Sequence, residues 1–288
     1  MKLQRLTIIG VGLIGGSFAL KLKQLGLVSE VVGYGHRVAN LQKALELGVI
    51  DRFETDLAKA VTDADLVVLS VPIGVIGELY AQMQPHLAAH TIVTDVGSAK
   101  GSVIADVTQA LGYCPTQFIP GHPIAGREKS GVEAVEADLY INHRVILTPS
   151  EQTDTQALER VKTLWSAVGA NVSVMTAQFH DEIFAATSHL PHMLAFALVD
   201  MLNEHDELGN VFQYTAGGFR DFTRIASSDA TMWRDIAVHN AEAIAKWLKE
   251  YQAELTRLTQ LIENRDAETL FRLFSEAKAA RDKHIINK

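Results

Sequence analysis

The sequence predicts an α/β protein in which a doubly wound, mainly parallel sheet is followed by an all-helical second domain. Short runs rich in β-branched residues alternate with helix-length segments through the first half of the chain. A glycine-rich loop follows the first of these runs, and the strand pattern stops after residue 175. Since 288 residues exceed the usual size of one core, we predict two domains, 1–175 and 176–288.

Seven strands are expected, at residues 6–9, 30–34, 66–71, 91–95, 117–120, 145–148 and 172–175. Helix-length segments separate most of them, for example residues 15–25, 38–47 and 100–111. Strands that alternate with helices in this way form βαβ units, so the strands of the sheet should run mainly parallel.

The second half carries apolar residues at helical spacing, among them Phe179, Ile183, Leu190, Leu194, Leu198 and Met201. A further helix is expected over residues 230–264, with one apolar face formed by Tyr251, Leu255, Leu258 and Ile262. Either the core of this domain or a second subunit can cover that face. We predict a homodimer in which the helical domains of the two subunits contact each other.

Composition and charge exclude several classes of function. The chain is 48% hydrophobic and 21% charged, which is typical of a soluble globular protein. A net charge of −8 argues against nucleic acid as a partner. The apolar runs are too short for a membrane span, the N-terminus has no signal-peptide pattern, and Cys114 is the only cysteine, so we expect a cytoplasmic protein. No CxxC or HExxH spacing indicates a metal.

The first strand leads directly into a G-x-G-x-x-G loop that opens a helix, with the residues Gly10, Val11, Gly12, Leu13, Ile14 and Gly15. Gly10 permits the tight turn, Gly12 lets the backbone approach a pyrophosphate, and Gly15 permits close packing of helix on strand. Glycines at such a turn can be merely structural, but strand, loop and helix occur here in the order that a dinucleotide requires. We therefore predict that residues 1–175 bind NAD or NADP.

The end of the second strand bears on the choice between these two cofactors. Proteins that bind NAD usually place Asp or Glu there to bind the ribose 2′-hydroxyl, but this chain has Gly35, followed by His36 and Arg37. A guanidinium favours a 2′-phosphate, although Arg37 can also be a solvated charge at the start of the next helix. The pattern favours NADP, with NAD possible, and we assign Val71 and Pro72 to the same site.

Two polar clusters follow strands directly, where open α/β sheets place their sites. Residues 95–100 include Ser98, which is either a helix N-cap or a site residue. Residues 121–131 include His122, next to Pro123 and flanked by glycines. A histidine in a loop is usually only a polar surface residue, but this position suits a general base.

The helical half contains two further clusters. Asp181, Ser188 and His192 have a spacing that places them on one helix face, and Pro191 should kink that helix or free a carbonyl near His192. Arg220 and Arg224 lie one turn apart after a glycine pair. We interpret Arg220 as a partner in a structural ion pair and Arg224 as a clamp for a carboxylate.

Four of these stretches together resemble the prephenate/arogenate (cyclohexadienyl) dehydrogenase family. They are the loop 10–17, His122-Pro123-Ile124-Ala125-Gly126, Ser188-His189-Leu190-Pro191-His192, and residues 218–226 with Trp233. The resemblance covers residues 6 to about 235 and implies a Rossmann-like domain followed by a helical one. It also implies the oxidative decarboxylation of prephenate to 4-hydroxyphenylpyruvate in tyrosine biosynthesis, of its amino analogue arogenate, or of both.

The resemblance also implies roles for single residues. His122 would be the catalytic base and Ser98 would assist it. His192 and Ser188 would contact the substrate, and Arg224 would bind a substrate carboxylate. Glu128 would shape the pocket.

Three alternatives stay open. The chain could be specific for arogenate and form tyrosine directly, although the basic residues Arg127 and Lys129 after His122 favour the more anionic prephenate. A β-hydroxyacid-type reductase would need a lysine on the helix after residue 176, where residues 177–201 have none. A non-catalytic NAD(P)-sensing protein would not need a histidine at a strand end and an arginine in the pocket.

Overall fold

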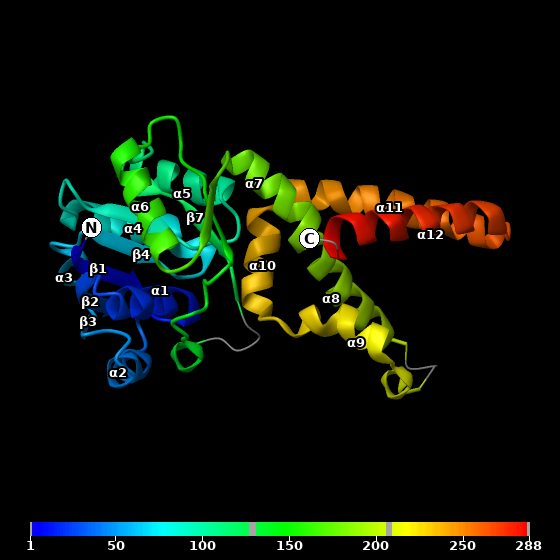
Figure 1. Ribbon diagram of the computed structural model, residues 1–288, viewed down its shortest axis with the longest axis horizontal. Coiled ribbons are helices and arrows are strands. Elements are labelled where there is room, and N and C mark those ends of the chain that lie inside the picture. The colour runs from blue at the N-terminus through cyan, green and yellow to red at the C-terminus, as the bar shows by residue number, and fades with distance from the viewer. Residues whose placement is uncertain (1, 127–130, 206–208, 287–288) are drawn as a thin grey trace. The chain divides into compact units, whose positions relative to one another are not determined.

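The computed structural model describes residues 2–126, 131–205 and 209–286 (Figure 1). The chain forms two compact units, Met1–Ala241 and Glu242–Lys288. The predicted boundary near residue 175 instead marks the point where strands give way to helices. It stays a prediction about domain organisation.

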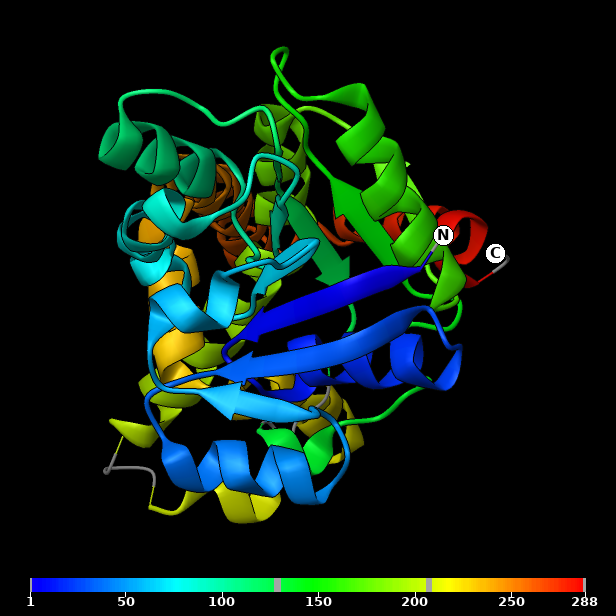
Figure 2. The same cartoon turned by 90° about the vertical axis from the view of Figure 1, so that its left-hand side faces the viewer.

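The main sheet has six parallel strands in the order β3-β2-β1-β4-β5-β6. Their bounds are Leu3–Ile9, Val28–Tyr34, Arg52–Glu54, Leu66–Leu69, Ile92–Asp95 and Phe118–Ile119 for β1 to β6. Between them lie α1 Leu13–Gln24, α2 Val38–Glu46, α3 Leu57–Val61, α4 Ile76–Met83 and α5 Gly101–Leu111. Figure 2 shows β1, β2 and β3 side by side with helices on both sides. This confirms the predicted doubly wound sheet.

The interior of the sheet explains its long apolar runs. Leu6 and Ile8 of β1 are fully buried in one cluster with Phe18 and Leu22 of α1. The same cluster contains Trp165 of α6, Thr155–Ala167, whose ring lies 4.2 Å from that of Phe18. Parallel strands with helices on both faces are buried on both faces, so their sequences are apolar without alternation.

A second sheet of three strands, β7 Gly121–Ile124, β8 Arg144–Leu147 and β9 Asn171–Val174, follows the first. The strands β8 and β9 overlap the predicted strands 145–148 and 172–175, but β7 was expected to be a loop and that expectation is wrong. β7 pairs antiparallel with β8, with His122 opposite Ile146. Glycine, histidine and proline have no strong strand preference, so this strand forms because β8 offers it a partner edge.

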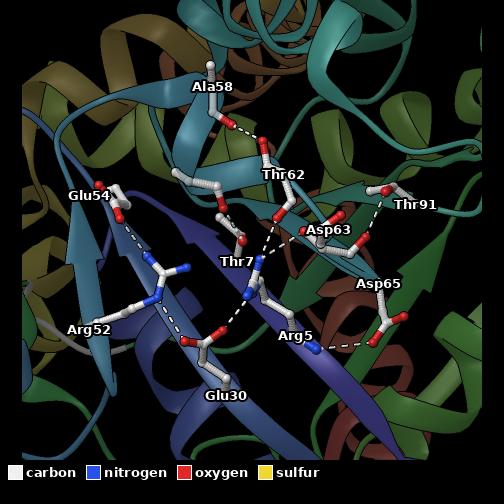
Figure 3. Close-up of polar contacts among 12 residues, drawn as sticks. Arg5, Thr7, Glu30, Arg52, Glu54, Ala58, Thr62, Asp63, Asp65 and Thr91 are labelled. Atoms are coloured by element: carbon white, nitrogen blue, oxygen red, sulfur yellow. Dashed lines mark hydrogen bonds and ion pairs between the residues drawn. The ribbon is translucent and has the colours of Figure 1, made fainter.

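Figure 3 shows a group of ion pairs at the N-terminal ends of β1 to β3. Glu30 lies between Arg5 and Arg52, with oxygen–nitrogen distances of 2.6 and 2.8 Å, and Arg52 also pairs with Glu54. The glycine loop begins at the opposite, carboxyl end of β1. Partly exposed pairs each contribute up to about 1 kcal/mol, so we assign this group to the stability of the sheet.

The helical part of the first unit consists of α7 Ala177–Phe184, α8 Leu190–Asn203, α9 Gly217–Thr223 and α10 Ala230–His239. A π-helix, Ala185–His189, joins α7 to α8. Within the described residues, one stretch, Ala177–Asn203, is long and apolar enough to cross a membrane by length and composition. Its His180 and Asp181 form hydrogen bonds with residues of the α/β part, so the first turns of this stretch pack against that part.

The helix expected over residues 230–264 is interrupted, and that part of the prediction is wrong. α10 ends at His239, and α11, Ala241–Glu263, begins after Asn240. Asn240 has a non-helical backbone with φ −122° and ψ 34°. Its side chain donates to the carbonyl of Asp181, a tertiary contact that local sequence patterns do not report.

The second unit contains most of α11, together with α12, Ala267–Arg281. Large apolar side chains are exposed on both helices, including Tyr251, Leu255 and Ile262 of the predicted apolar face and Phe271 and Phe274 of α12. Phe271 is 75% exposed. Exposed apolar residues in such number on one hairpin are typical of an interaction surface.

Candidate active site

The turn between β1 and α1 uses each of its three glycines differently. Gly10 has φ +86°, and an added Cβ would lie 2.3 Å from the carbonyl oxygen of Ser70. A Cβ on Gly15 would lie 2.7 Å from Ile8. A Cβ on Gly12 would have nothing within 4 Å, so the backbone there faces open space at the start of a helix. These residues fit a bound pyrophosphate.

The end of β4 supports this turn. The amide of Gly15 donates to Ser70 Oγ over 3.1 Å, and Val71 lies against Gly10. Pro72 follows as the N-cap of a short 3-10 helix, Ile73–Val75. The structure therefore brings Val71 to the glycine loop, and Ser70 is a supporting residue that the sequence pattern did not reveal.

Two contacts fix the helices around the loop. Asn40 Nδ2 of α2 donates to the carbonyl of Val11 over 2.7 Å, and the hydroxyl of Tyr140 donates to the carbonyl of Ile14, next to Leu13 in the first turn of α1. These contacts join distant segments to the loop. Neither was expected from the sequence.

His36 and Arg37 are exposed beyond the end of β2, which stops at Tyr34. Arg37 is the N-cap residue of α2, and its backbone is extended there. Gly35 is followed by these two basic residues at the carboxyl edge of the sheet, the edge from which the glycine loop also emerges. The position suits contact with the far ribose of a dinucleotide.

His122 lies inside strand β7 and is 8% exposed. Its Nδ1 is 2.8 Å from Nε2 of His180, which is fully buried in α7. Nδ1 of His180 is in turn 2.7 Å from Oδ1 of Asp181. The ring of Phe184 packs against both imidazoles. These contacts form a His122–His180–Asp181 relay that joins β7 to α7.

The relay fixes the protons on both rings. A carboxylate only accepts hydrogen bonds, so His180 carries its proton on Nδ1 and presents the lone pair of Nε2. His122 must then donate from Nδ1, which leaves its Nε2 without a proton when the ring is neutral. Nε2 of His122 is therefore a base.

Asp181 is held in place from several sides. Its two oxygens accept the backbone amides of Lys100 and Gly101 at 2.8 and 2.7 Å, so it caps the N-terminus of α5 from another element. Burial would raise the pKa of Asp181, but hydrogen bonds from His180 and from these amides hold it below its usual value. The Asp181 carboxylate remains charged, as the relay requires.

A buried ion pair positions the peptide before His122. Lys100 Nζ pairs with Asp95 and donates to the carbonyl of Gly121 over 2.8 Å, and both charged side chains are fully buried. Asp95 also accepts the amides of Gly97 and Gly121. Paired and hydrogen-bonded charges of this kind hold one geometry firmly, since leaving either charge unpaired would be costly.

His122 is neutral at physiological pH. Its burial, followed by the nearby His180, Lys100 and His189, lowers its pKa well below the ordinary 6.5. Burial likewise lowers the pKa of His189 to about 4. Protonation of His122 would bury a positive charge beside the Lys100 ammonium, so the base form is the stable one.

Ser98 lies in the turn between β5 and α5, half-buried between Gly97 and Ala99. It is not the N-cap of α5, because that helix begins at Gly101 after Lys100. The cap is supplied by Asp181 instead. That alternative for Ser98 is therefore wrong. Ser98 belongs to the turn whose Asp95 and Lys100 form hydrogen bonds with Gly121, the residue before His122.

The π-helix Ala185–His189 determines which side chains of the Ser188–His192 segment face the interior. The side chains of His180, Ala185 and His189 are buried in this helical stretch, and Ser188, which precedes His189, is half-buried. The ring of His189 receives a hydrogen-bonding contact from Asn240 Nδ2 at 3.1 Å. The extra residue of a π-turn shifts the helix face, and such turns are frequent at functional sites.

His192 lies in the first turn of α8 with its Nδ1 2.8 Å from the carbonyl oxygen of Ser188. Its ring stacks on Trp233 of α10, with centroids 3.6 Å apart. Arg224 lies at the start of the 3-10 helix Arg224–Ser227, and its positive charge lowers the pKa of His192. The structure thus brings His192, Ser188 and Arg224 together, whereas Glu128, Arg127 and Lys129 lie outside the described residues.

His189 links this group to the relay. His189 lowers the pKa of His122, and His180 and His192 in turn lower the pKa of His189. Asn240 contacts both the carbonyl of Asp181 and the ring of His189, and Trp233 contacts the rings of both His189 and His192. A series of contacts therefore joins the relay to His192, whose neighbour Arg224 is cationic. A neutral base at one end and a cation at the other suit a substrate that carries a hydroxyl and a carboxylate at opposite ends.

Sequence reasoning missed His180, Lys100 and Asn240 as site residues. His180 is 58 residues from its partner His122 and has no motif of its own. The burial of the ionisable His180 and Lys100, and the tertiary hydrogen bonds of Asn240, reveal these residues only in three dimensions.

The chain matches two family models in succession. Residues 18–174 match the prephenate dehydrogenase nucleotide-binding domain, and residues 176–276 match the prephenate dehydrogenase dimerization domain. Cyclohexadienyl dehydrogenase of Zymomonas mobilis is 37% identical over 283 residues, which cover 96% of this chain and 95% of the relative.

Two solved structures are similar over nearly the whole chain. The prephenate dehydrogenase of Aquifex aeolicus, in complex with hydroxyphenyl propionate and NAD+, has a TM-score of 0.91 at 39% identity and covers 98% of this chain and 99% of that one. Synechocystis arogenate dehydrogenase has a TM-score of 0.82 at 30% identity, with 98% and 100% covered. The sheet, the buried base and these likenesses agree, and the chain belongs to the prephenate dehydrogenase family.

Proposed function

We propose that the chain oxidises prephenate, arogenate or both at a nicotinamide cofactor, with loss of the ring carboxylate as CO2. The observation that carries this proposal is the His122–His180–Asp181 relay, which leaves Nε2 of a buried, neutral imidazole without a proton and able to accept one. The relatives support this proposal, because they include a prephenate dehydrogenase, an arogenate dehydrogenase and a cyclohexadienyl dehydrogenase.

In this mechanism Nε2 of His122 takes the proton of the 4-hydroxyl as hydride leaves C4. A dinucleotide whose pyrophosphate is held by the glycine loop would supply its nicotinamide ring as the hydride acceptor. The bond from the ring to its carboxylate then breaks, CO2 leaves, and the electron pair enters the ring and makes it aromatic. The phenolate oxygen takes the proton back from His122. Base catalysis of this kind contributes about 10²–10⁴-fold to a rate.

The other site residues hold the substrate in this mechanism. Arg224 binds a carboxylate with charge-assisted hydrogen bonds, and His192 and Ser188 face the side chain of the substrate. Ser98 assists His122 from the neighbouring turn. Positioning of this kind converts binding energy into rate, because the reacting atoms are already aligned.

Steady-state rates with prephenate and arogenate, each with NAD and NADP, test the function. We expect reduced cofactor to form with at least one substrate. If the protein binds a dinucleotide but reduces it with neither substrate, the reading of a non-catalytic NAD(P)-sensing protein replaces the present one.

We also propose that NADP is preferred to NAD, because Gly35 stands where an acidic side chain would repel the 2′-phosphate and Arg37 is exposed beside it. Arg37→Ala should weaken NADP by about tenfold and leave NAD nearly unchanged. Fluorescence titrations of both cofactors measure this. Equal losses for the two cofactors would contradict contact with the 2′-phosphate, and Lys43→Ala, on the same helix, serves as the control.

The working form that we propose is a homodimer through the helical domain. Two observations support it, the match of residues 176–276 to a family model described as a dimerization domain and the exposed apolar side chains of α11 and α12. Sedimentation equilibrium at micromolar concentration should give twice the mass of 31.5 kDa. A single species of monomer mass would contradict the proposal.

The cytoplasm is the compartment that we propose for this protein. Cys114 is a free thiol, as expected in a reducing compartment, and the biosynthetic activity of the relatives fits the same location. Fractionation of the cells that make the protein would locate it. Recovery from the membrane or secreted fraction would contradict this assignment.

A further inference from the structure

Asn240, which interrupts the helical path between α10 and α11, reaches two residues of another helical stretch with its side chain. Its Nδ2 lies 2.9 Å from the carbonyl oxygen of Asp181 and 3.1 Å from Nδ1 of His189. Asp181 belongs to α7, and His189 is the last residue of the π-helix that follows. One buried amide group therefore spans the whole π-helix Ala185–His189.

The carbonyl of Asp181 decides how the Asn240 amide is oriented. A carbonyl oxygen only accepts hydrogen bonds, so the nitrogen of the amide faces it, and the amide oxygen does not. The same nitrogen lies against Nδ1 of His189. An amide NH2 group has two hydrogens and only donates, so it donates to both neighbours. Nδ1 of His189 is therefore an acceptor.

His189 consequently carries its proton on Nε2. Burial, followed by the nearby His180, lowers its pKa to about 4, so the ring is neutral at physiological pH and has a single N–H. His180 and His192 have the other tautomer, because their Nδ1 atoms donate to the Asp181 carboxylate and to a main-chain carbonyl. Asn240 thus imposes on His189 the tautomer opposite to that of its neighbours.

The π-helix that Asn240 spans sets the rotation of α8 relative to α7. A π-turn contains one residue more than an α-turn, and one residue corresponds to about 100° around a helix axis. Because π-helices are rare, contacts from outside the helix are expected to favour this one. A regular α-helix would turn His189 away from Asn240 while Asp181 kept its place. The two hydrogen bonds of the amide therefore favour the π-form.

Asp181 is the fixed end of this span. Its carboxylate accepts two backbone amides at the start of α5, and its carbonyl also accepts the amide of Ala185. Loss of the Asn240 side chain would leave that carbonyl paired, so the variant should fold. The end that is released is His189, together with the segment that continues into α8.

We infer that Asn240 is a positioning residue that holds the π-helix between the relay and the Ser188–His192 segment and keeps His189 in the tautomer that donates from Nε2. Its role rests on the proposed function, in which that segment faces the side chain of the substrate. Asn240 itself touches neither substrate nor cofactor. It acts on substrate binding through His189 and the start of α8, and it leaves the transfer of proton and hydride unchanged.

Nitrogen NMR of the wild-type protein tests the tautomer without any turnover. Long-range proton–nitrogen correlation spectra of protein labelled in its histidines distinguish Nδ1–H from Nε2–H. The signals that disappear in His189→Gln are those of His189. At pH 7 we expect the proton of His189 on Nε2, and a proton on its Nδ1 overturns the inference.

Asn240→Asp keeps the shape of the side chain but replaces the donor by an acceptor. The carboxylate accepts from Nδ1 of His189 and faces the carbonyl oxygen of Asp181, so the His189 proton should move to Nδ1. We expect KM for the substrate to rise about tenfold or more, the effect of a lost hydrogen bond. kcat should change by less than about threefold, and cofactor affinity should stay at its wild-type value.

Asn240→Ala removes the donor without adding a charge, and it should raise KM in the same direction by a smaller factor. The KM effect is specific to substrate binding, whereas a merely structural role would lower kcat and cofactor affinity as well. Wild-type KM in both variants overturns the inference. A parallel loss of kcat, substrate binding and cofactor binding overturns it too.

A matched control is Asn171→Asp, because the amide of Asn171 also donates to a carbonyl oxygen, that of Asn142 at 3.3 Å, but lies exposed at the start of β9. It should have the KM and the His189 tautomer of the wild type, and a change in either would mean that the effect is not specific to Asn240. Failure of the two hypotheses is distinguishable. If the wild type converts neither substrate, the proposed function fails and the NMR result still decides the tautomer. Turnover with unchanged KM in both Asn240 variants defeats only the positioning by Asn240.

Discussion

His122→Asn should lower kcat by about 10²–10⁴-fold and leave KM nearly unchanged, since an amide cannot take the hydroxyl proton in the transition state. Asparagine suits this test because its amide can still donate to Nε2 of His180, which preserves the buried contact and the fold. Steady-state kinetics with saturating cofactor measure the effect. Near-normal turnover would rule out His122 as the base.

The pH profile gives an independent measure of the same residue. The pKa of His122 lies well below 6.5, so wild-type kcat/KM should be constant through neutral pH and fall only as acid protonates the ring. The residual activity of His122→Asn should lack this decline.

Arg224→Ala should contrast with His122→Asn, because loss of a carboxylate anchor should raise KM while kcat changes little.

Gly10→Ala and Gly12→Ala should separate the folding role of the glycine loop from its binding role. Alanine at position 10 meets the Ser70 oxygen at 2.3 Å and must adopt φ +86°, so we expect a loss of at least about 3 kcal/mol in unfolding free energy. The melting temperature should fall by about 6 °C or more. Thermal denaturation without ligand measures it.

Gly12→Ala should have the opposite signature. Its methyl group meets nothing within 4 Å, so the melting temperature should stay within about 1–2 °C of the wild type. The same methyl group occupies the space in which the pyrophosphate approaches the backbone, and cofactor affinity should drop by about tenfold or more. Wild-type affinity in isothermal titration would mean that the pyrophosphate binds elsewhere.

Local patterns predicted the parts of this protein that depend on a few adjacent residues. Strands β1 and β2 and the helix that starts at Leu13 follow from apolar runs around a G-x-G-x-x-G loop. The interruption at Asn240 did not follow, because Asn240 leaves the helix to bond Asp181, which is 59 residues away. Strand β7 was missed for a similar reason, since its pairing partner β8 decides its conformation.

By itself the sequence determined the doubly wound sheet, the nucleotide loop and the candidacy of His122, His192 and Arg224, because periodicity and motif spacing act over short stretches of chain. Only the tertiary structure decided the protonation of the site. Which nitrogen of His122 is a base depends on His180 and Asp181, and which nitrogen of His192 accepts depends on the Ser188 carbonyl. Burial and hydrogen bonds set these states, and both arise when segments far apart in the chain pack together.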